Sequence, residues 1–177
     1  MSFNLKKSVL FFIGSFSIFG NVSHSEEKTM VSPITLETVV NAPKSQVWND
    51  WTTSEGVKSF VVPDANIELV IGGKYEFYFD QEQPNGLQGS EGCKVLSFLP
   101  EEMLSFSWNA PPVFPVERLE YTWVVIQLTD LGNNKTKVRL THMGWREGGR
   151  RLEVREYFTK AWPHVFKGLE EKYNHRE

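Results

Sequence analysis

The feature that most constrains this chain is an amphipathic segment near its C-terminal end, from Arg150 to Tyr173. Large apolar residues recur there at steps of three and four, the spacing that places side chains on one face of an α-helix. Charged residues fill most of the other positions, so the segment predicts a long helix laid onto a core. Pro163 lies inside it, and because proline lacks an amide hydrogen and its ring clashes with the preceding turn, we expect the helix to bend or divide there. The apolar stripe consists of Tyr157, Phe158, Ala161, Trp162, Val165, Phe166, Leu169 and Tyr173.

The chain between residue 34 and this helix is typical of strands joined by turns. Two short helices are expected after the first strand, over about 43–52 and 54–60, because Asn41-Ala42-Pro43 and Ser54 are typical of helix starts. The Gly72-Gly73 pair predicts a tight turn between the second and third strands. Alternating or short apolar runs predict about seven strands, over Ile34–Val40, Ile67–Ile71, Lys74–Phe79, Ser90–Leu99, Met103–Trp108, Leu119–Leu128 and Thr136–Met143.

These strands need a partner for their apolar face, and the C-terminal helix is the one long helix that the pattern predicts. We therefore predict an α+β fold in which a curved antiparallel sheet of about seven strands wraps around that helix. The length of 177 residues and an ordinary globular composition favour one domain, placed at 34–177. A strongly curved sheet that grips a helix encloses space.

The first 25 residues are typical of a secretory signal peptide. Lys6 and Lys7 precede an apolar run from Val9 to Phe19, and Ser23 and Ser25 supply small residues at alternate positions. Because the run is well short of the roughly 20 residues that span a bilayer, an uncleaved anchor is the weaker alternative. We expect an exported protein, periplasmic or secreted, with no stable membrane insertion after cleavage and with residues 26–33 as a flexible leader.

Composition narrows the possible partners. The net charge is only −3, and lysine and arginine form no long stripe, so a nucleic-acid partner is not expected. Cys93 is the single cysteine and lies in a strand pattern, which favours a buried small hydrophobe over the alternative of a reactive thiol. His24, His164 and His175 show no metal-ligand spacing, and no glycine motif cradles a phosphate, so neither a metal nor a cofactor is expected. The oligomeric state stays open.

Four motifs in order resemble the START-like, or Bet v 1-like (SRPBCC), superfamily, in its branch similar to the activator of the 90-kDa heat-shock protein ATPase. The resemblance covers about Ile34 to Tyr173 and implies a helix-grip fold with an apolar cavity between sheet and helix. It does not imply one function, because similar folds bind lipids, act on polyketides or dock to chaperones. One departure is Ser59-Phe60-Val61, where many members carry a Trp-Trp pair. The motifs are Asn41-Ala42-Pro43 with Val47-Trp48 and Trp51-Thr52, then Ile71 to Tyr75, Lys135 to His142, and Trp162 with Phe166 and Leu169.

Two residues are candidates for acid–base chemistry. His142 shares a strand face with Val138 and Leu140, so its imidazole should face the cavity, where it would orient a ligand or move protons. The alternative is a core-edge histidine satisfied by a hydrogen bond. Glu76 alternates with aromatic neighbours. If it faces inward it is a carboxylate in an apolar pocket, the environment of a general base, and if the aromatics face inward it is solvated.

The expected cavity mouth adds two further candidates. Arg118 would clamp a carboxylate or phosphate of a ligand there, or else form a surface ion pair. The loop from Asn109 to Val116 is either a lid with Phe114 as its apolar tip or a rigid connection whose Phe114 packs on the body of the protein. The full set of residues expected to line the cavity is Phe77, Leu104, Phe106, Trp108, Phe114, Arg118, Trp123, Leu140, His142, Phe158 and Trp162.

These features favour a protein that binds a small apolar or amphipathic molecule without covalent chemistry, because such ligands require a mostly apolar pocket with one or two placed polar groups. An alternative is an enzyme of the polyketide cyclase or dehydratase kind that uses His142 and Glu76. A third hypothesis, a chaperone-docking module, follows from the family branch, but export would separate the protein from cytosolic ATP-driven chaperones.

Overall fold

The computed structural model describes residues 31–174, so the predicted signal peptide at 1–25 and most of the leader lie outside the described residues. The α+β class is confirmed, with the predicted long helix, two short helices and seven strands. The elements are β1 (Ile34–Val40), α1 (Lys44–Thr52), α2 (Ser54–Lys58), β2 (Asp64–Ile67), β3 (Tyr75–Tyr78), β4 (Val95–Leu99), β5 (Met103–Trp108), the 3-10 helix η1 (Glu117–Leu119), β6 (Thr122–Asp130), β7 (Thr136–Met143) and α3 (Arg151–Asn174).

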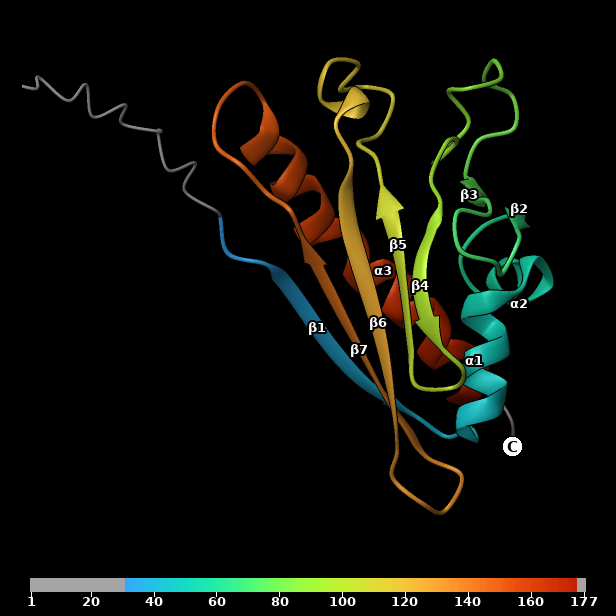
Figure 1. Cartoon of the computed structure of the whole chain (residues 1–177). Coiled ribbons are helices and arrows are strands. Elements are labelled where there is room, and N and C mark those ends of the chain that lie inside the picture. The colour runs from blue at the N-terminus through green and yellow to red at the C-terminus, as the bar shows by residue number, and fades with distance from the viewer. Residues whose placement is uncertain (1–30, 175–177) are drawn as a thin grey trace, which may run out of the picture.

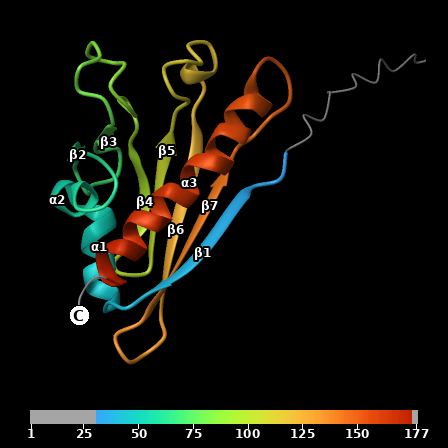
Figure 2. The same cartoon turned by 180° about the vertical axis from the view of Figure 1, so that it is seen from behind.

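The sheet is antiparallel and grips α3 on one face, as predicted for a helix-grip fold (Figure 1). Five strands follow the order β1-β7-β6-β5-β4, and β2 and β3 form a separate ladder of two. Viewed from behind, α3 runs diagonally across the face of the sheet, with β1 alongside it (Figure 2). Backbone hydrogen bonds join β3 and the turn before it to the start of β4 and the chain just before it. Tyr75 N donates to Cys93 O at 2.9 Å, and Gly72 N donates to Val95 O at 2.8 Å. The small ladder therefore extends the edge of the large sheet.

Several strand boundaries differ from the prediction. The expected strand over Ile67–Ile71 is wrong, because β2 ends at Ile67 and the chain then turns, with Gly73 N bonded to Val70 O at 2.8 Å. Ile71 is 75% exposed, so this apolar residue lies on the surface and not in a buried strand. Leu119 belongs to η1, and β6 begins only at Thr122. In both cases an apolar residue outside a strand, in a turn or in the 3-10 helix, resembles the end or the start of one.

The long helix is a single element that continues through Pro163, so of the two expected outcomes, a bend or a division, the division does not occur. Trp162 and Phe166, on either side of the proline, are 3% and 4% exposed. Burial of two large rings against the sheet outweighs the one backbone hydrogen bond that proline removes. None of the helices within residues 31–174 is long and apolar enough to cross a membrane.

The C-terminal half of α3 is tied to the two short helices. The buried Asp50 carboxylate of α1 accepts a hydrogen bond from Tyr173 Oη and forms an ion pair with Lys172 Nζ at 2.5 Å. Gly168 permits a close approach at the same place, because a Cβ there would lie 2.3 Å from the carbonyl oxygen of Phe60. These contacts bring the segment that follows α2 against the helix, next to the site described below.

Candidate functional site

A cavity of about 560 Å³ opens at the end of the molecule where the long loops emerge. Its walls come from four segments that are distant in sequence: the middle of α3 (157–165), loop 79–90, residues 108–112 and the Phe60-Val61 pair after α2. Most of the lining is apolar or aromatic. Its polar groups are Asp80, Gln83, Gln88, Ser90, Asn109 and His164, and the lining contains neither lysine nor arginine.

Three aromatic rings separate this cavity from the core. Trp108 at the end of β5 and Trp162 on α3 lie with their ring centroids 5.6 Å apart, and Phe158 stacks on Trp162 at 6.0 Å. All three were predicted to line the cavity, and the structure places them in its wall. Each is at most 6% exposed, so the three rings form a packed floor.

His142 lies behind that floor and is completely buried. Trp162 Nε1–H donates to its Nδ1 at 2.9 Å, and its Nε2 lies 2.7 Å from Thr122 Oγ1. Because Nδ1 accepts, the proton belongs on Nε2, which donates to the threonine hydroxyl, and that hydroxyl donates to Trp108 O at 2.9 Å. Burial lowers the pKa of His142 to about 3. The residue is a neutral core imidazole with both nitrogens occupied, as in the second of its two predicted alternatives.

Glu76 fits neither of its predicted alternatives. Its neighbours Tyr75 and Phe77 face the core and are 0% and 1% exposed, so the carboxylate points the other way. It is nonetheless 9% exposed and not solvated, because it accepts hydrogen bonds from Gly92 N and from Tyr78 Oη, each at 2.8 Å. Burial, together with the hydrogen bond to Glu76, raises the pKa of Tyr78 to about 12. Glu76 and His142 therefore do not converge on one reaction site.

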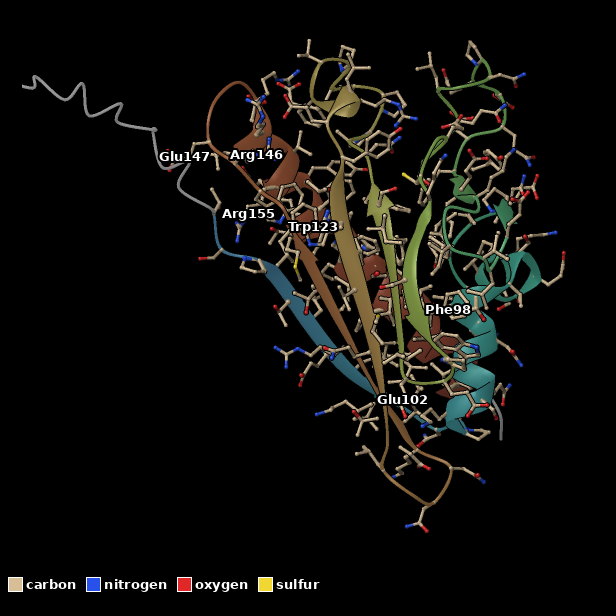
Figure 3. The ribbon with its side chains drawn as sticks, viewed as in Figure 1. Phe98, Glu102, Trp123, Arg146, Glu147 and Arg155 are labelled. Atoms are coloured by element: carbon tan, nitrogen blue, oxygen red, sulfur yellow. The ribbon has the colours of Figure 1, made fainter. Side chains whose placement is uncertain are left out.

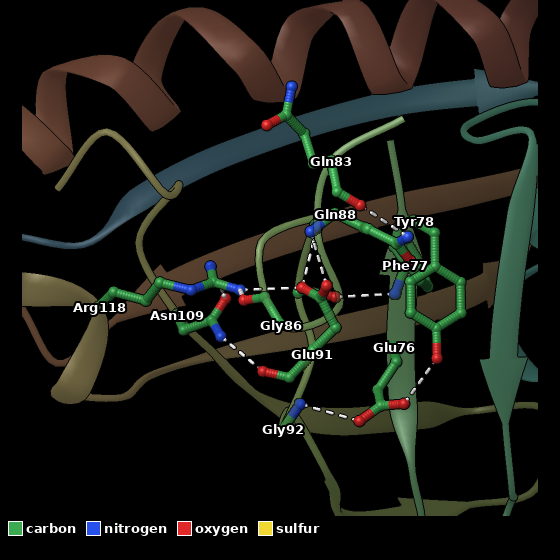
Figure 4. A network of polar contacts seen from close by, with 12 residues as sticks. Glu76, Phe77, Tyr78, Gln83, Gly86, Gln88, Glu91, Gly92, Asn109 and Arg118 are labelled. Carbon is green, nitrogen blue, oxygen red and sulfur yellow. Dashed lines mark hydrogen bonds and ion pairs between the residues drawn. The ribbon is translucent and has the colours of Figure 1, made fainter. Parts of the chain in front are cut away.

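Arg118 closes a network between the two loops that border the cavity (Figure 4). Its Nη2 contacts Glu91 Oε2 at 2.9 Å and Gly86 O at 3.1 Å. Its Nη1 donates to Ala110 O at 2.6 Å and to Asn109 Oδ1 at 3.2 Å. The guanidinium is thus committed to protein acceptors, which leaves it poorly placed for the predicted role of clamping an anionic ligand.

Glu91 is the ion-pair partner of Arg118 in this network, and we call the pair the Glu91–Arg118 clasp. Besides Arg118, it accepts hydrogen bonds from Gln88 N at 2.6 Å and Gly89 N at 2.8 Å. Burial alone would raise the pKa of Glu91, but these backbone donors and the Arg118 charge outweigh burial and hold the pKa below its ordinary value. Asn109 Nδ2 adds a bond to Glu91 O at 2.8 Å. The Glu91–Arg118 clasp therefore fixes both loops that form the mouth.

Two predicted lining residues lie elsewhere. Phe114 is 7% exposed and packs beside Tyr157 at 6.4 Å, under the Arg150 guanidinium at 4.5 Å, so its loop follows the rigid alternative and Phe114 is not an apolar tip. Trp123 was expected inside, but its neighbour Val124 is fully buried, so strand alternation places Trp123 on the opposite face, away from α3 (Figure 3). The placement of Trp123 in the cavity is wrong.

The remaining predicted residues fill the space between sheet and helix. Tyr75 stacks on Phe106 with ring centroids 4.1 Å apart, so side chains occupy much of what was expected to be an open cavity. The predicted residues found in this packed core are Phe77, Leu104, Phe106, Leu140 and His142.

Nine of the twelve apolar or aromatic residues in the cavity wall were not among the predicted lining residues. Tyr157, Ala161 and Val165 belong to the predicted helix stripe, at steps of four, and the stripe could have identified them. The others come from loops, whose conformation a periodic pattern does not reveal. They are Phe60, Val61, Phe79, Leu87, Pro111 and Pro112.

Ligation and thiol chemistry find no support in this part of the chain. Within residues 31–174, no group of three or more His, Cys, Asp or Glu side chains could hold a metal ion. Cys93 is fully buried, and burial raises the pKa of its thiol to about 12. The thiol is thus protonated and enclosed at neutral pH.

Comparison with known proteins identifies the architecture. The model of the family described as Activator of Hsp90 ATPase homolog 1-like protein matches residues 41–173. The Aha1 dimer from Colwellia psychrerythraea is 21% identical over 81% of this chain and 96% of its own, with a TM-score of 0.62. A protein from Nitrosomonas europaea is also 21% identical, over 80% of this chain and 93% of its own, with a TM-score of 0.62. At this identity, the structural likeness shows the fold alone. No curated protein gives a significant match.

Proposed function

This chain belongs to the family of Activator of Hsp90 ATPase homolog 1-like proteins, and from that premise we propose that it binds a small apolar or amphipathic molecule, non-covalently, in the cavity at the loop end of the fold. The observation that carries the proposal is the cavity itself. Its volume of about 560 Å³ falls within the roughly 300–1,000 Å³ of small-molecule sites, and such sites are mostly apolar with a few placed polar groups.

The position of the polar groups supports binding over catalysis. Acid–base chemistry on a polyketide would require two groups that reach one substrate. His142 lies behind the Trp108–Trp162 floor with both nitrogens occupied, and Glu76 faces away from the core. Neither side chain lines the cavity, so this geometry does not favour the enzyme hypothesis.

The proposal includes export. Its support is the layout of residues 1–25, with two lysines, an apolar run and small residues in that order. An exported carrier or sensor would meet its ligand outside the cytoplasm, apart from cytosolic ATP-driven chaperones. Chaperone docking is therefore not the function that we propose.

Titration with 1-aminoanthracene, a neutral fluorescent aromatic, tests the binding proposal. We expect saturable binding that Ala161→Trp abolishes or weakens at least tenfold, because Ala161 is half-buried in the cavity wall and an indole there would fill the space. The matched control is Lys160→Trp, one residue away on the exposed side of α3, which should bind as the wild type does. Binding that Ala161→Trp leaves unchanged, with both variants folded by circular dichroism, would refute the proposal.

A further inference from the structure

The cavity wall contains a buried polar group that the fold leaves without a partner, the indole N–H of Trp108. Trp108 is 3% exposed and lies in the cavity wall. Within residues 31–174, its Nε1 makes no hydrogen bond. Among the side-chain nitrogens of residues 31–174, Trp51 Nε1 is the one that is both fully enclosed and without a partner. Trp108 Nε1 also lacks a partner but is not fully enclosed, so it borders accessible space. Because Trp108 is otherwise buried, the cavity is the space that this N–H faces.

Several other donors of the lining are already committed, whereas Tyr157 and His164 are exposed side chains that water can reach. The second indole of the floor, Trp162, donates to His142 Nδ1. Asn109 Nδ2 donates to Glu91 O, and Gln88 Nε2 donates to two backbone carbonyls at 3.0 and 3.3 Å. Gln83 Nε2 donates to Asp80 Oδ2 at 3.0 Å. A buried donor without a partner costs free energy, and a ligand acceptor that supplies the missing bond recovers it.

The charges around the cavity restrict the ligand further. No lysine or arginine lines it, and the guanidinium of Arg118 is held by Glu91 and three other acceptors. The one carboxylate of the lining, on Asp80, lies at the exposed rim. A ligand anion would lose its hydration inside without gaining a cation, which is strongly unfavourable.

The walls of the cavity are largely aromatic. The floor presents the rings of Trp108, Phe158 and Trp162, and Phe60, Phe79 and Tyr157 add aromatic surface at the sides. Aromatic walls pack best against flat rings, by stacking or by edge-to-face contact.

We propose that the cavity selects a flat, uncharged ring molecule with a carbonyl or ether oxygen that accepts a hydrogen bond from Trp108 Nε1. This inference rests on the proposed function and specifies its ligand class. Trp108 acts as the specificity-determining donor, and the surrounding rings supply the apolar contact. Fatty acids, phosphates and other anions fall outside this class.

Three probes of similar shape test the inference by displacing 1-aminoanthracene. Fluorene has no acceptor, 9-fluorenone adds a carbonyl, and fluorenone-4-carboxylate adds a negative charge. For the wild type we expect fluorenone to bind about 2- to 12-fold tighter than fluorene, the range that one net hydrogen bond supplies. The carboxylate should bind at least about tenfold weaker than fluorenone, because its charge finds no partner.

Trp108→Phe removes the N–H and keeps an aromatic ring, so it should reduce the fluorenone preference to less than about twofold. The matched control is Trp123→Phe on the outer face of the sheet, which should keep the full preference. Equal binding of fluorene and fluorenone by the wild type, or a preference that survives Trp108→Phe, would overturn the role of Trp108. Tight binding of the carboxylate would overturn the requirement for an uncharged ligand. If Trp108→Phe does not fold, the comparison of the three probes on the wild type decides.

The two proposals fail in different ways. If 1-aminoanthracene and all three probes fail to bind the wild type, the proposed function fails and this inference falls with it. If 1-aminoanthracene binds in the cavity but fluorenone and fluorene displace it equally well, the binding function stands and the hydrogen-bond specificity is wrong.

Discussion

Mild acid should destabilise this protein through one buried residue, His142. Desolvation lowers its folded-state pKa to about 3, whereas an exposed histidine titrates near 6.5. Between these pH values His142 is protonated in the unfolded chain but not in the folded protein, so the free energy of unfolding rises with pH in that window. The stabilisation is fully present above about pH 6.5 and is lost progressively as the pH falls toward 3.

The magnitude follows from the width of the window. Each pH unit below the unfolded pKa costs about 1.4 kcal/mol for one proton, so a change from about pH 7.5 to 5.0 should remove about 2 kcal/mol. This figure is nearly independent of the folded pKa as long as that pKa stays below about 4. The side chains around the imidazole are those of Thr122, Trp145, Phe158 and Trp162, none of which titrates in this range.

Urea unfolding followed by tryptophan fluorescence at the two pH values measures the effect. His142→Gln removes the titrating group and should flatten the pH dependence by about 2 kcal/mol, although the variant starts from a lower stability because the bonds to Trp162 and Thr122 are disturbed. The matched control, His164→Gln, replaces an exposed histidine of α3 and should keep the wild-type pH dependence. Equal m-values at both pH values would show that the same transition is compared.

A wild type that loses less than about 0.5 kcal/mol over this interval would refute the argument, because a buried neutral imidazole must produce the larger loss. The same conclusion would follow if His142→Gln lost as much stability as the wild type. The three carboxylates whose pKa values are clearly lowered add little to this change. Glu91, Glu117 and Glu156 all have pKa values below the ordinary 4.5, so their protonation affects stability only at lower pH.

Two further predictions concern the clasp at the cavity mouth and the N-terminus. Arg118→Met should cost about 1–3 kcal/mol, because it leaves the largely buried Glu91 without its cation, and hydrogen exchange should quicken at residues 86–92 and 109–118. The matched control Arg139→Met, which removes a half-exposed pair with Glu37, should cost less than about 1 kcal/mol, and equal losses would contradict the role of the clasp. N-terminal sequencing of exported protein should begin near Glu26, and an intact Met1 on secreted material would exclude cleavage.

The parts of the fold that periodicity controls were predictable. The stripe of α3 identified Phe158 and Trp162 as buried, and alternation in β7 placed His142 and Leu140 on the inner face. These residues follow rules that depend only on the spacing along their own element. For the same reason the helix-grip architecture followed from one long amphipathic helix and a series of short strands.

Where two neighbouring residues are both apolar, the pattern loses this power. Trp123 and Val124 are adjacent and both fit an inward position, yet only Val124 is buried. The register of β6 decides between them, and pairing of Val124 with His142 on β7 sets that register. A cross-strand pairing of this kind is a tertiary fact, so a single sequence left the two residues undistinguished.

The cavity wall was the least predictable part because most of it depends on contacts between distant segments. Phe60 reaches the cavity because its backbone packs on Gly168, more than a hundred residues later. Leu87 and Pro111 lie on loops that the Glu91–Arg118 clasp holds together. Glycine, proline and charged residues in a sequence indicate where loops lie, but they do not indicate which loops contact each other.

This arrangement separates stability from binding. The rings between sheet and helix fill the middle of the molecule, and Trp162 and Thr122 occupy the two nitrogens of His142. Substitutions in this core should change the free energy of unfolding and leave ligand affinity nearly intact. The cavity lies beyond the Trp108–Trp162 floor, between loops that the clasp positions. Loss of Arg118 should therefore weaken binding more than its cost in stability suggests, because a mouth that samples open conformations binds in proportion to the fraction of time it is correctly formed. Trp108 belongs to both sets, since its ring packs in the floor and its N–H faces the cavity, and only there should one substitution change stability and specificity together.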